Sequence, residues 1–151
     1  MEFEVVVWDG EELHVGPWPQ DFYAFPLVPP EDQLAEVLSG KAGGELPRYS
    51  RVRMHFKLEY VNPTPLTTAS GGLWIVSASG EEVLLKNVVV GDTNPVDEAD
   101  FDVTAHLNVP NPAMGVNPVK LSMGPASTVG GIPLPETVYR VWLRIYGSWG
   151  W

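Results

Sequence analysis

The stretch RVRMHFKLEY, residues 51–60, alternates polar and apolar side chains along its whole length. Successive side chains of a β-strand point to opposite faces of the sheet, so this pattern predicts a strand with one buried face. The expected buried face consists of Val52, Met54, Phe56, Leu58 and Tyr60, and the solvated face of Arg51, Arg53, His55, Lys57 and Glu59.

Other segments carry the same period or are apolar enough for a buried strand. The predicted strands are residues 73–77, 83–90, 101–107, 119–123 and 137–146, with 83–90 read as one strand or as a pair with a bulge. Residues 91–100 read as an acidic loop. In the last strand, the side chains expected to face inward are Tyr139, Val141, Leu143 and Ile145.

The first segment, Phe3–Val15, is apolar on one face and contains Asp9-Gly10, a pair typical of a two-residue hairpin turn. It is predicted to form a β-hairpin. Residues 16–30 hold five prolines, which cannot donate a backbone hydrogen bond, together with several large apolar side chains. This stretch is predicted to be an extended arm laid over a surface.

Glu31–Ser39 is the one good helix candidate. Pro30 suits the first turn, the acids Glu31 and Asp32 suit the positive end of the helix dipole, and Gly40 suits the exit.

Together these elements predict an all-β protein, a β-sandwich or a jelly-roll-like fold with an extended N-terminal arm and one short helix. A chain of 151 residues is expected to form a single domain over residues 1–151. Its expected parts are the hairpin at 1–15, the proline-rich arm and short helix at 16–47, and the main β core at 48–151.

Composition limits the possible partners. The net charge is -10, and residues 1–47 contain ten acids and one base. Nucleic-acid binding and binding to anionic membranes both need clustered basic residues, so neither is expected. The chain has no Cys, no apolar run long enough to span a membrane, and an acidic N-terminus unlike a signal peptide. Scarce Gln and proline-rich loops favour a heat-adapted, thermostable protein.

Candidate reactive groups are sparse. The three histidines, His14, His55 and His106, come without a nucleophile motif or a zinc-ligand spacing, so no catalytic residue, metal site or cofactor is expected. The acids at residues 92–102 crowd together, which leaves open a structural cation there, although the spacing is not that of a calcium loop.

The aromatic residues are the best candidates for a functional surface. Two Trp residues close to a chain end expose a costly apolar patch unless they pack against something, either their own core or a neighbouring subunit. The residues expected at a partner or oligomer interface are Trp18, Phe22, Tyr23, Phe25, Trp149 and Trp151. Aromatic rings also stack on sugars, and the candidate rings for that role are Trp18, Trp142, Trp149 and Trp151.

A small acidic β-domain with an N-terminal hairpin at 3–15, an arm at 16–30 and alternating strands at 51–60, 101–107 and 137–146 resembles the decoration (auxiliary) proteins of tailed-bacteriophage capsids. The resemblance implies a jelly-roll-like or tulip-like fold and a non-enzymatic structural protein that forms homo-oligomers, typically trimers. It also implies binding to the major capsid protein lattice on the capsid exterior, after synthesis in the host cytoplasm.

Three other functions stay open from the residues alone. They are a carbohydrate-binding β-sandwich module, another virion component such as a tail or connector protein, and an enzyme with a carboxylate-based site.

Overall fold

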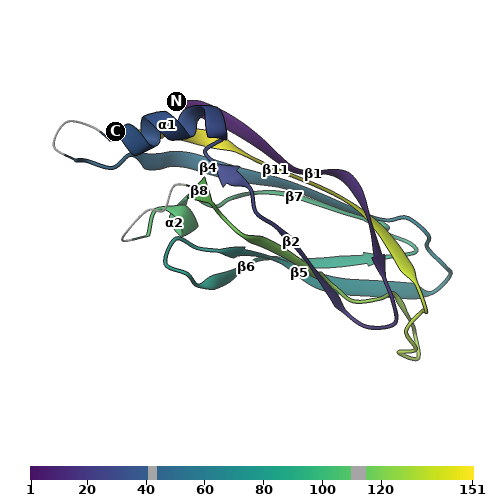
Figure 1. Cartoon of the computed structure of the whole chain (residues 1–151). Helices are drawn as coiled ribbons and strands as arrows, with labels where there is room; N and C mark the ends of the chain where they lie inside the picture. The colour runs from purple at the N-terminus through teal and green to yellow at the C-terminus, as the bar shows by residue number, and fades with distance from the viewer. Residues whose placement is uncertain (41–43, 110–114) are drawn as a thin grey trace.

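Antiparallel strands dominate the computed structural model, which describes residues 1–40, 44–109 and 115–151 (Figure 1). Strands make up 59% of the chain and helices 9%, which confirms the predicted all-β sandwich. The strands are β1 (Glu2–Val15), β2 (Gln20–Ala24), β3 (Leu27–Val28), β4 (Arg48–Tyr60), β5 (Thr67–Val76), β6 (Glu82–Gly91), β7 (Val96–Asp102), β8 (Gly115–Val116), β9 (Val119–Met123), β10 (Ser127–Thr128) and β11 (Thr137–Gly150). The helices are α1 (Glu31–Ser39) and α2 (Thr104–Leu107).

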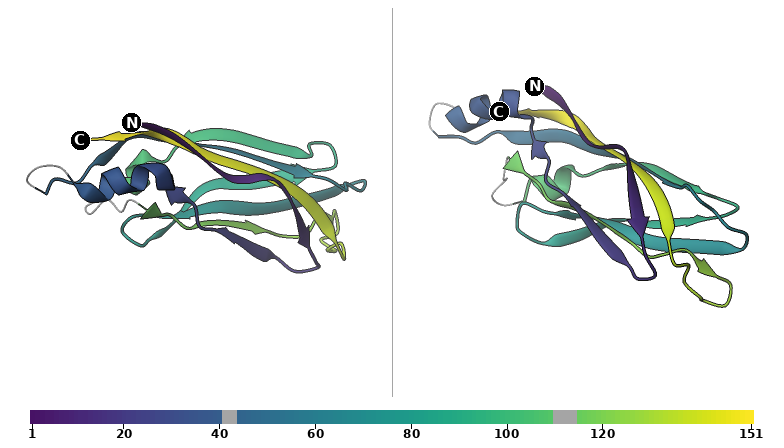
Figure 2. Two further views of the ribbon diagram at one scale, coloured as in Figure 1. Left: turned by 45° about the horizontal axis from the view of Figure 1, so that its top comes forward. Right: turned by 45° about the vertical axis from the view of Figure 1, so that its right-hand side comes forward.

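Two sheets lie face to face and form an elongated sandwich (Figure 2). The first sheet has the order β1-β11-β4-β7. In the second, β6, β5, β9 and β2 lie side by side, and the short β10 pairs with the start of β5. The chain crosses repeatedly between the sheets, and this strand order is that of a jelly roll, as the sequence predicted.

The core lies between the sheets and follows the predicted alternation. All five apolar residues of the 51–60 pattern are at most 1% exposed, and so are the four inward residues predicted for β11. The facing sheet contributes Leu73 and Ile75 of β5 and the alternate residues of β9. Each fully buried Leu, Ile or Phe stabilises the fold by about 1.5–3 kcal/mol relative to an exposed one.

The predicted hairpin at Phe3–Val15 is wrong. This segment is one continuous strand, β1, which pairs with β11 from Glu2 to Val15. Gly10 has φ 84°, but it supplies a β-bulge between Asp9 and Glu11 and not a turn. The 14-residue β11 offers β1 a partner for its whole length, and that long-range pairing replaces the local turn.

Two predictions around residue 100 also need correction. The predicted acidic loop contains the start of β7, and the predicted strand 101–107 ends at Asp102 and gives way to α2. Asp102 Oδ1 accepts a hydrogen bond from the Thr104 backbone N–H at 2.8 Å, which favours the helical turn. Val103 and Leu107 are four residues apart, so they share a face in a helix as well as in a strand, and both are buried.

The proline-rich segment 16–30, predicted to be an extended arm laid over a surface, contains two short strands of the domain. Its middle forms β2, the edge strand of the second sheet, and residues 27–28 form β3, which pairs with β8. The helix prediction is confirmed, because α1 spans Glu31–Ser39 and Gly40 follows with φ 72°.

Candidate functional site

One long side of the sandwich is open. β1 is the edge of the first sheet and β2 the edge of the second, and no backbone hydrogen bond joins the two strands within the described residues. The opposite side is bridged. There Lys86 of β6 pairs with Asp97 of β7 at 3.0 Å, and Asp97 also accepts a hydrogen bond from the Val89 backbone at 3.1 Å. The β1/β2 side is therefore the place where this jelly roll leaves apolar surface uncovered.

A groove of about 420 Å³ runs along that open side. It is lined by Val5, Val6 and Val7 from β1, and by the chain from the end of β2 to the start of β3, with Pro30 and Glu31 at its end. The residues of that connecting stretch are Ala24, Phe25, Pro26 and Leu27. We call this the edge groove. Phe25 is 64% exposed and Val6 is 58% exposed, so large apolar groups line the edge groove in contact with water.

The local sequence explains why the edge groove stays open. Pro26 and the pair at 29–30 cannot donate to a sheet, so the chain cannot continue β2 as a long strand beside β1. A bulge in β1 between Val6 and Trp8 changes the alternation, so that Val6 points outward while Trp8 is buried.

The structure separates the six predicted interface residues. Phe25 lines the edge groove, Tyr23 is exposed on β2 outside it, and Phe22 is half-buried and packs against the core. Trp18 is 75% exposed in the loop between β1 and β2, at the end of the sandwich away from α1 (Figure 1).

The two C-terminal tryptophans lie at the other end, beside α1. Trp149 is 2% exposed, its Nε1 donates to Gln33 Oε1 at 2.7 Å, and its backbone N–H donates to the Met1 carbonyl at 2.9 Å. Trp151 is 41% exposed, packs edge-on against Trp149 with ring centroids 5.5 Å apart, and donates from Nε1 to the Glu45 carbonyl. Trp149 therefore packs on its own core, and only Trp151 keeps accessible surface.

Sequence reasoning missed several exposed apolar residues. Val6 lies opposite the face that Phe3, Val5 and Val7 share, so the alternation puts an apolar residue on the solvated side. At the end of the sandwich near Trp18, the loops expose Leu66, Val129 and Ile132. Leu66 has φ 58°, a left-handed conformation that a leucine adopts only at a cost. No pattern in a loop sequence marks such residues in advance.

On the outer face of the first sheet, acidic side chains of the edge strands β1 and β7 contact Arg and Tyr side chains of β11 and β4. The acids of β1 lie beside the arginines of β11, with Glu4 3.6 Å from Arg144 and Glu12 3.8 Å from Arg140. On the other side, the Asp100 carboxylate of β7 accepts hydrogen bonds from Tyr146 at 2.5 Å and from Arg53 at 2.6 Å. These bonds hold the pKa of Asp100 below its usual range.

Some exposed charged side chains make no ion pair with the described residues, and they belong to two groups. Asp21, Glu31 and Asp32, near the edge groove, are exposed and make no ion pair with the described residues. Arg48 and Arg51, at the start of β4, are also exposed and without an ion pair within the described part of the chain. We call Glu31 and Asp32 the acidic edge and Arg48 and Arg51 the basic end. Both lie toward the end of the sandwich that holds α1, because Gln33 Nε2 donates to the Glu2 carbonyl and Glu2 is in register with Ser148, the β11 partner of Arg51.

The predicted reactive groups are engaged in surface contacts. His14 lies between Glu12 and Glu136, at 2.8 and 2.6 Å, and His55 lies within 3.5 Å of Glu98 and Asp100. The acids at 92–102, the candidates for a cation, bind backbone N–H groups or bases through Asp92, Asp97, Glu98, Asp100 and Asp102. In residues 1–40, 44–109 and 115–151, no group of three or more His, Cys, Asp or Glu side chains is placed to hold a metal ion. Neither described helix is long and apolar enough to cross a membrane.

Comparison with known proteins gives only distant likenesses. No protein-family model matches the chain, and no curated protein does. Among solved structures, the chain is similar to that of Desmodium yellow mottle tymovirus, with 10% identity and a TM-score of 0.42 over 100% of this chain and 88% of that one. It is also similar to VP2 of infectious bursal disease virus, in the structure of the VP2 subviral particle, with 9% identity and a TM-score of 0.45 over 97% of this chain. The chain spans about a third, 32%, of the length of that VP2 chain. Since these scores are low, the function has to be inferred from the surface of this molecule.

Proposed function

We propose that this protein is a non-enzymatic structural protein that forms a homotrimer and decorates the outside of a phage capsid shell. The edge groove carries the proposal. Burial of apolar surface against a neighbour gains about 25 cal/mol per Å², and grouped exposed apolar side chains, here Val6 and Phe25, mark contact surfaces in soluble proteins.

The neighbour on the edge groove is a second copy of this chain, because the charges are complementary. Exposed Glu31 and Asp32 lie at the start of α1, at the end of the groove, and exposed Arg48 and Arg51 lie at the start of β4, on a different element at the same end of the molecule. Contact between the acidic edge of one copy and the basic end of the next is head-to-tail. Such contacts form a ring when the rotation between copies closes and an open filament when it does not, and the smallest such ring, a trimer, is the assembly proposed here.

An exterior position on a shell fits the charge of the molecule. A net charge of -10 opposes contact with packaged nucleic acid. A trimer also presents each of its surfaces three times, so weak contacts with a repeating lattice of major capsid protein add up through avidity.

The first test measures the mass in solution by light scattering. The wild type is expected to be trimeric, and Phe25→Ser, Glu31→Lys and Arg51→Glu are each expected to shift the protein toward monomer. The double variant Glu31→Lys/Arg51→Glu reverses both charges and is expected to restore the trimer. Glu81→Lys is the control, because Glu81 is an exposed acid far along the chain from the edge groove.

The second test mixes purified protein with undecorated shells and counts bound copies by cryo-EM. Stoichiometric binding at lattice symmetry positions, weakened by the Phe25→Ser variant, supports the proposal. A monomeric wild type that leaves shells bare overturns it, and binding to isolated tails or connectors instead would assign the protein to that part of the virion.

A further inference from the structure

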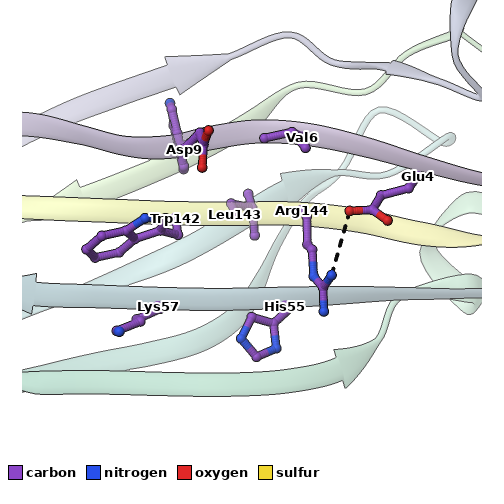
Figure 3. A pocket seen from close by; sticks show the side chains of 9 residues that line it. Glu4, Val6, Asp9, His55, Lys57, Trp142, Leu143 and Arg144 are labelled. Atoms are coloured by element: carbon purple, nitrogen blue, oxygen red, sulfur yellow. Dashed lines mark ion pairs between the residues drawn. The ribbon is translucent and has the colours of Figure 1, made fainter.

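A second surface feature lies on the outer face of the first sheet, apart from the edge strand β2. Trp142 of β11 points outward there, and its register partners are Asp9 on β1 and Lys57 on β4. Figure 3 shows the three side chains in a row across three neighbouring strands. They line a groove of about 450 Å³, which we call the Trp142 groove. This volume is in the range of about 300–1,000 Å³ that is usual for small-molecule sites.

Most charged groups around the Trp142 groove are already engaged. Arg144 pairs with Glu4 at 3.6 Å and lies over the Tyr146 ring, and His55 contacts two acids of β7. In contrast, the carboxylate of Asp9 and the ammonium of Lys57 make no ion pair with any described residue. One acceptor and one donor therefore remain free on opposite sides of the indole.

The indole is half-buried and keeps part of its surface accessible. Lys57 Nζ lies 5.0 Å from the centroid of the Trp142 ring, so the ammonium is held close to the aromatic surface. The Nε1–H groups of Trp149 and Trp151 are bound within the molecule, whereas that of Trp142 has no hydrogen-bond partner among the described residues. A side chain at Gly10 would crowd this edge, because a Cβ there would lie 3.1 Å from Trp142 Nε1.

We infer that the Trp142 groove binds a neutral pyranose sugar. A pyranose has a face of C–H groups, which packs on an indole, and a rim of hydroxyls, each of which both donates and accepts hydrogen bonds. The free Asp9 carboxylate accepts from a hydroxyl, while Lys57 and the indole N–H donate. The free acid and the free base lie on either side of the ring, so neither an anionic nor a cationic ligand is favoured over an uncharged one.

Sugar binding is inferred for the single chain and does not require the proposed assembly. Trp142 lies six residues along β11 from Ser148, the register partner of Arg51, and six strand residues span about 20 Å, so contacts at the basic end lie away from the Trp142 groove. The edge groove shares Val6 with the Trp142 groove, whereas Asp9, Lys57 and Trp142 do not line the edge groove. In an oligomer, several weak sugar sites on one particle would bind a glycan surface through avidity.

The test follows the indole N–H signals by two-dimensional NMR while glucose, galactose or N-acetylglucosamine is added to the full-length protein. We expect a saturable shift of the Trp142 signal with at least one of these sugars. Trp142→Ala, in which binding is followed by the backbone amide signals of Asp9 and Lys57, is expected to weaken binding about tenfold or more. Asp9→Asn and Lys57→Gln, which keep the indole and the strand, are expected to weaken it as well. Trp18→Ala and Trp151→Ala are matched controls and are expected to bind like the wild type.

Three results would overturn the inference. They are no shift with any of the three sugars at tens of millimolar, shifts that map to Trp18 or Trp151, and binding that survives all three groove variants. Stronger binding of sialic acid or of glucosamine than of every neutral sugar would contradict the assignment of an uncharged ligand. A trimer that decorates shells but fails these titrations would leave the proposed function intact.

Discussion

At the scale of single residues, His14 shows how a surface contact is coupled to pH. Hydrogen bonds to Glu136 and to Glu12 raise the pKa of His14 above its ordinary value of about 6.5. A raised pKa means that the folded protein holds the proton more tightly than the unfolded chain does. The stabilisation from this contact is therefore fully present below about pH 6.5 and is lost as the pH rises through the raised pKa of the folded state.

We predict that Glu136→Gln lowers the pKa of His14 toward its ordinary value, as measured by NMR titration of the imidazole protons. The destabilisation caused by this variant is expected to be larger at pH 5.5 than at pH 8.5. A pKa of His14 that does not change in the variant would mean that Glu136 does not bind the imidazolium.

Gly71 is a residue at which the sheet tolerates no side chain. A Cβ on Gly71 would lie 1.9 Å from the Ser122 carbonyl oxygen on the neighbouring β9, a distance that requires the backbone to move. We predict that Gly71→Ala destabilises the protein by about 1–3 kcal/mol in urea unfolding. Gly130→Ala is the control, because a Cβ there meets only the Thr128 hydroxyl at 3.9 Å and should change stability little.

At the scale of elements, the end of β11 ties the sandwich to α1. The strand continues to Gly150, beyond the predicted end at residue 146. Trp149 is buried in the core next to α1 and donates a hydrogen bond from Nε1 to Gln33 of that helix. We predict that Trp149→Ala costs about 3–5 kcal/mol of unfolding free energy, since a buried Trp is replaced by a cavity. Trp151→Ala, which removes a side chain that is 41% exposed, should cost clearly less.

Deletion of residues 147–151 tests the same element as a whole. It is expected to lower the melting temperature more than Trp151→Ala does, because it also removes the β11 pairing with β4 at Val52 and Arg51. An unchanged melting temperature, oligomer mass and Trp emission maximum would show that the tail contributes nothing.

At the scale of the whole molecule, contact between the acidic edge of one copy and the basic end of the next makes the proposed trimer sensitive to salt. The screening length falls from about 10 Å at 0.1 M salt to about 3 Å at 1 M. We predict that the fraction of trimer, measured by light scattering at fixed protein concentration, falls as salt rises. The Phe25→Ser variant should need lower salt to dissociate. If the trimer mass does not depend on salt in the wild type or in the Phe25→Ser variant, charge complementarity does not hold the trimer together.

Much of this molecule could be predicted from local sequence. Alternation along 51–60 and 137–146 identified the buried faces of β4 and β11, because the side-chain period of a strand does not depend on its partner. The bounds of α1 follow from Pro30, the acids of the first turn and Gly40, all of which act within the helix itself.

The tertiary structure alone decided which strands pair and which side of the sandwich stays open. Asp9-Gly10 is a turn signal, yet it became a bulge because β11 pairs with β1 over its full length. The first bulge turns Trp8 inward and leaves both Val6 and Asp9 on the outer face, where Asp9 is in register with Trp142 and where Val6 lines both grooves. Neither groove has a signature in the sequence, because each is assembled from strands whose neighbours in space are far apart along the chain.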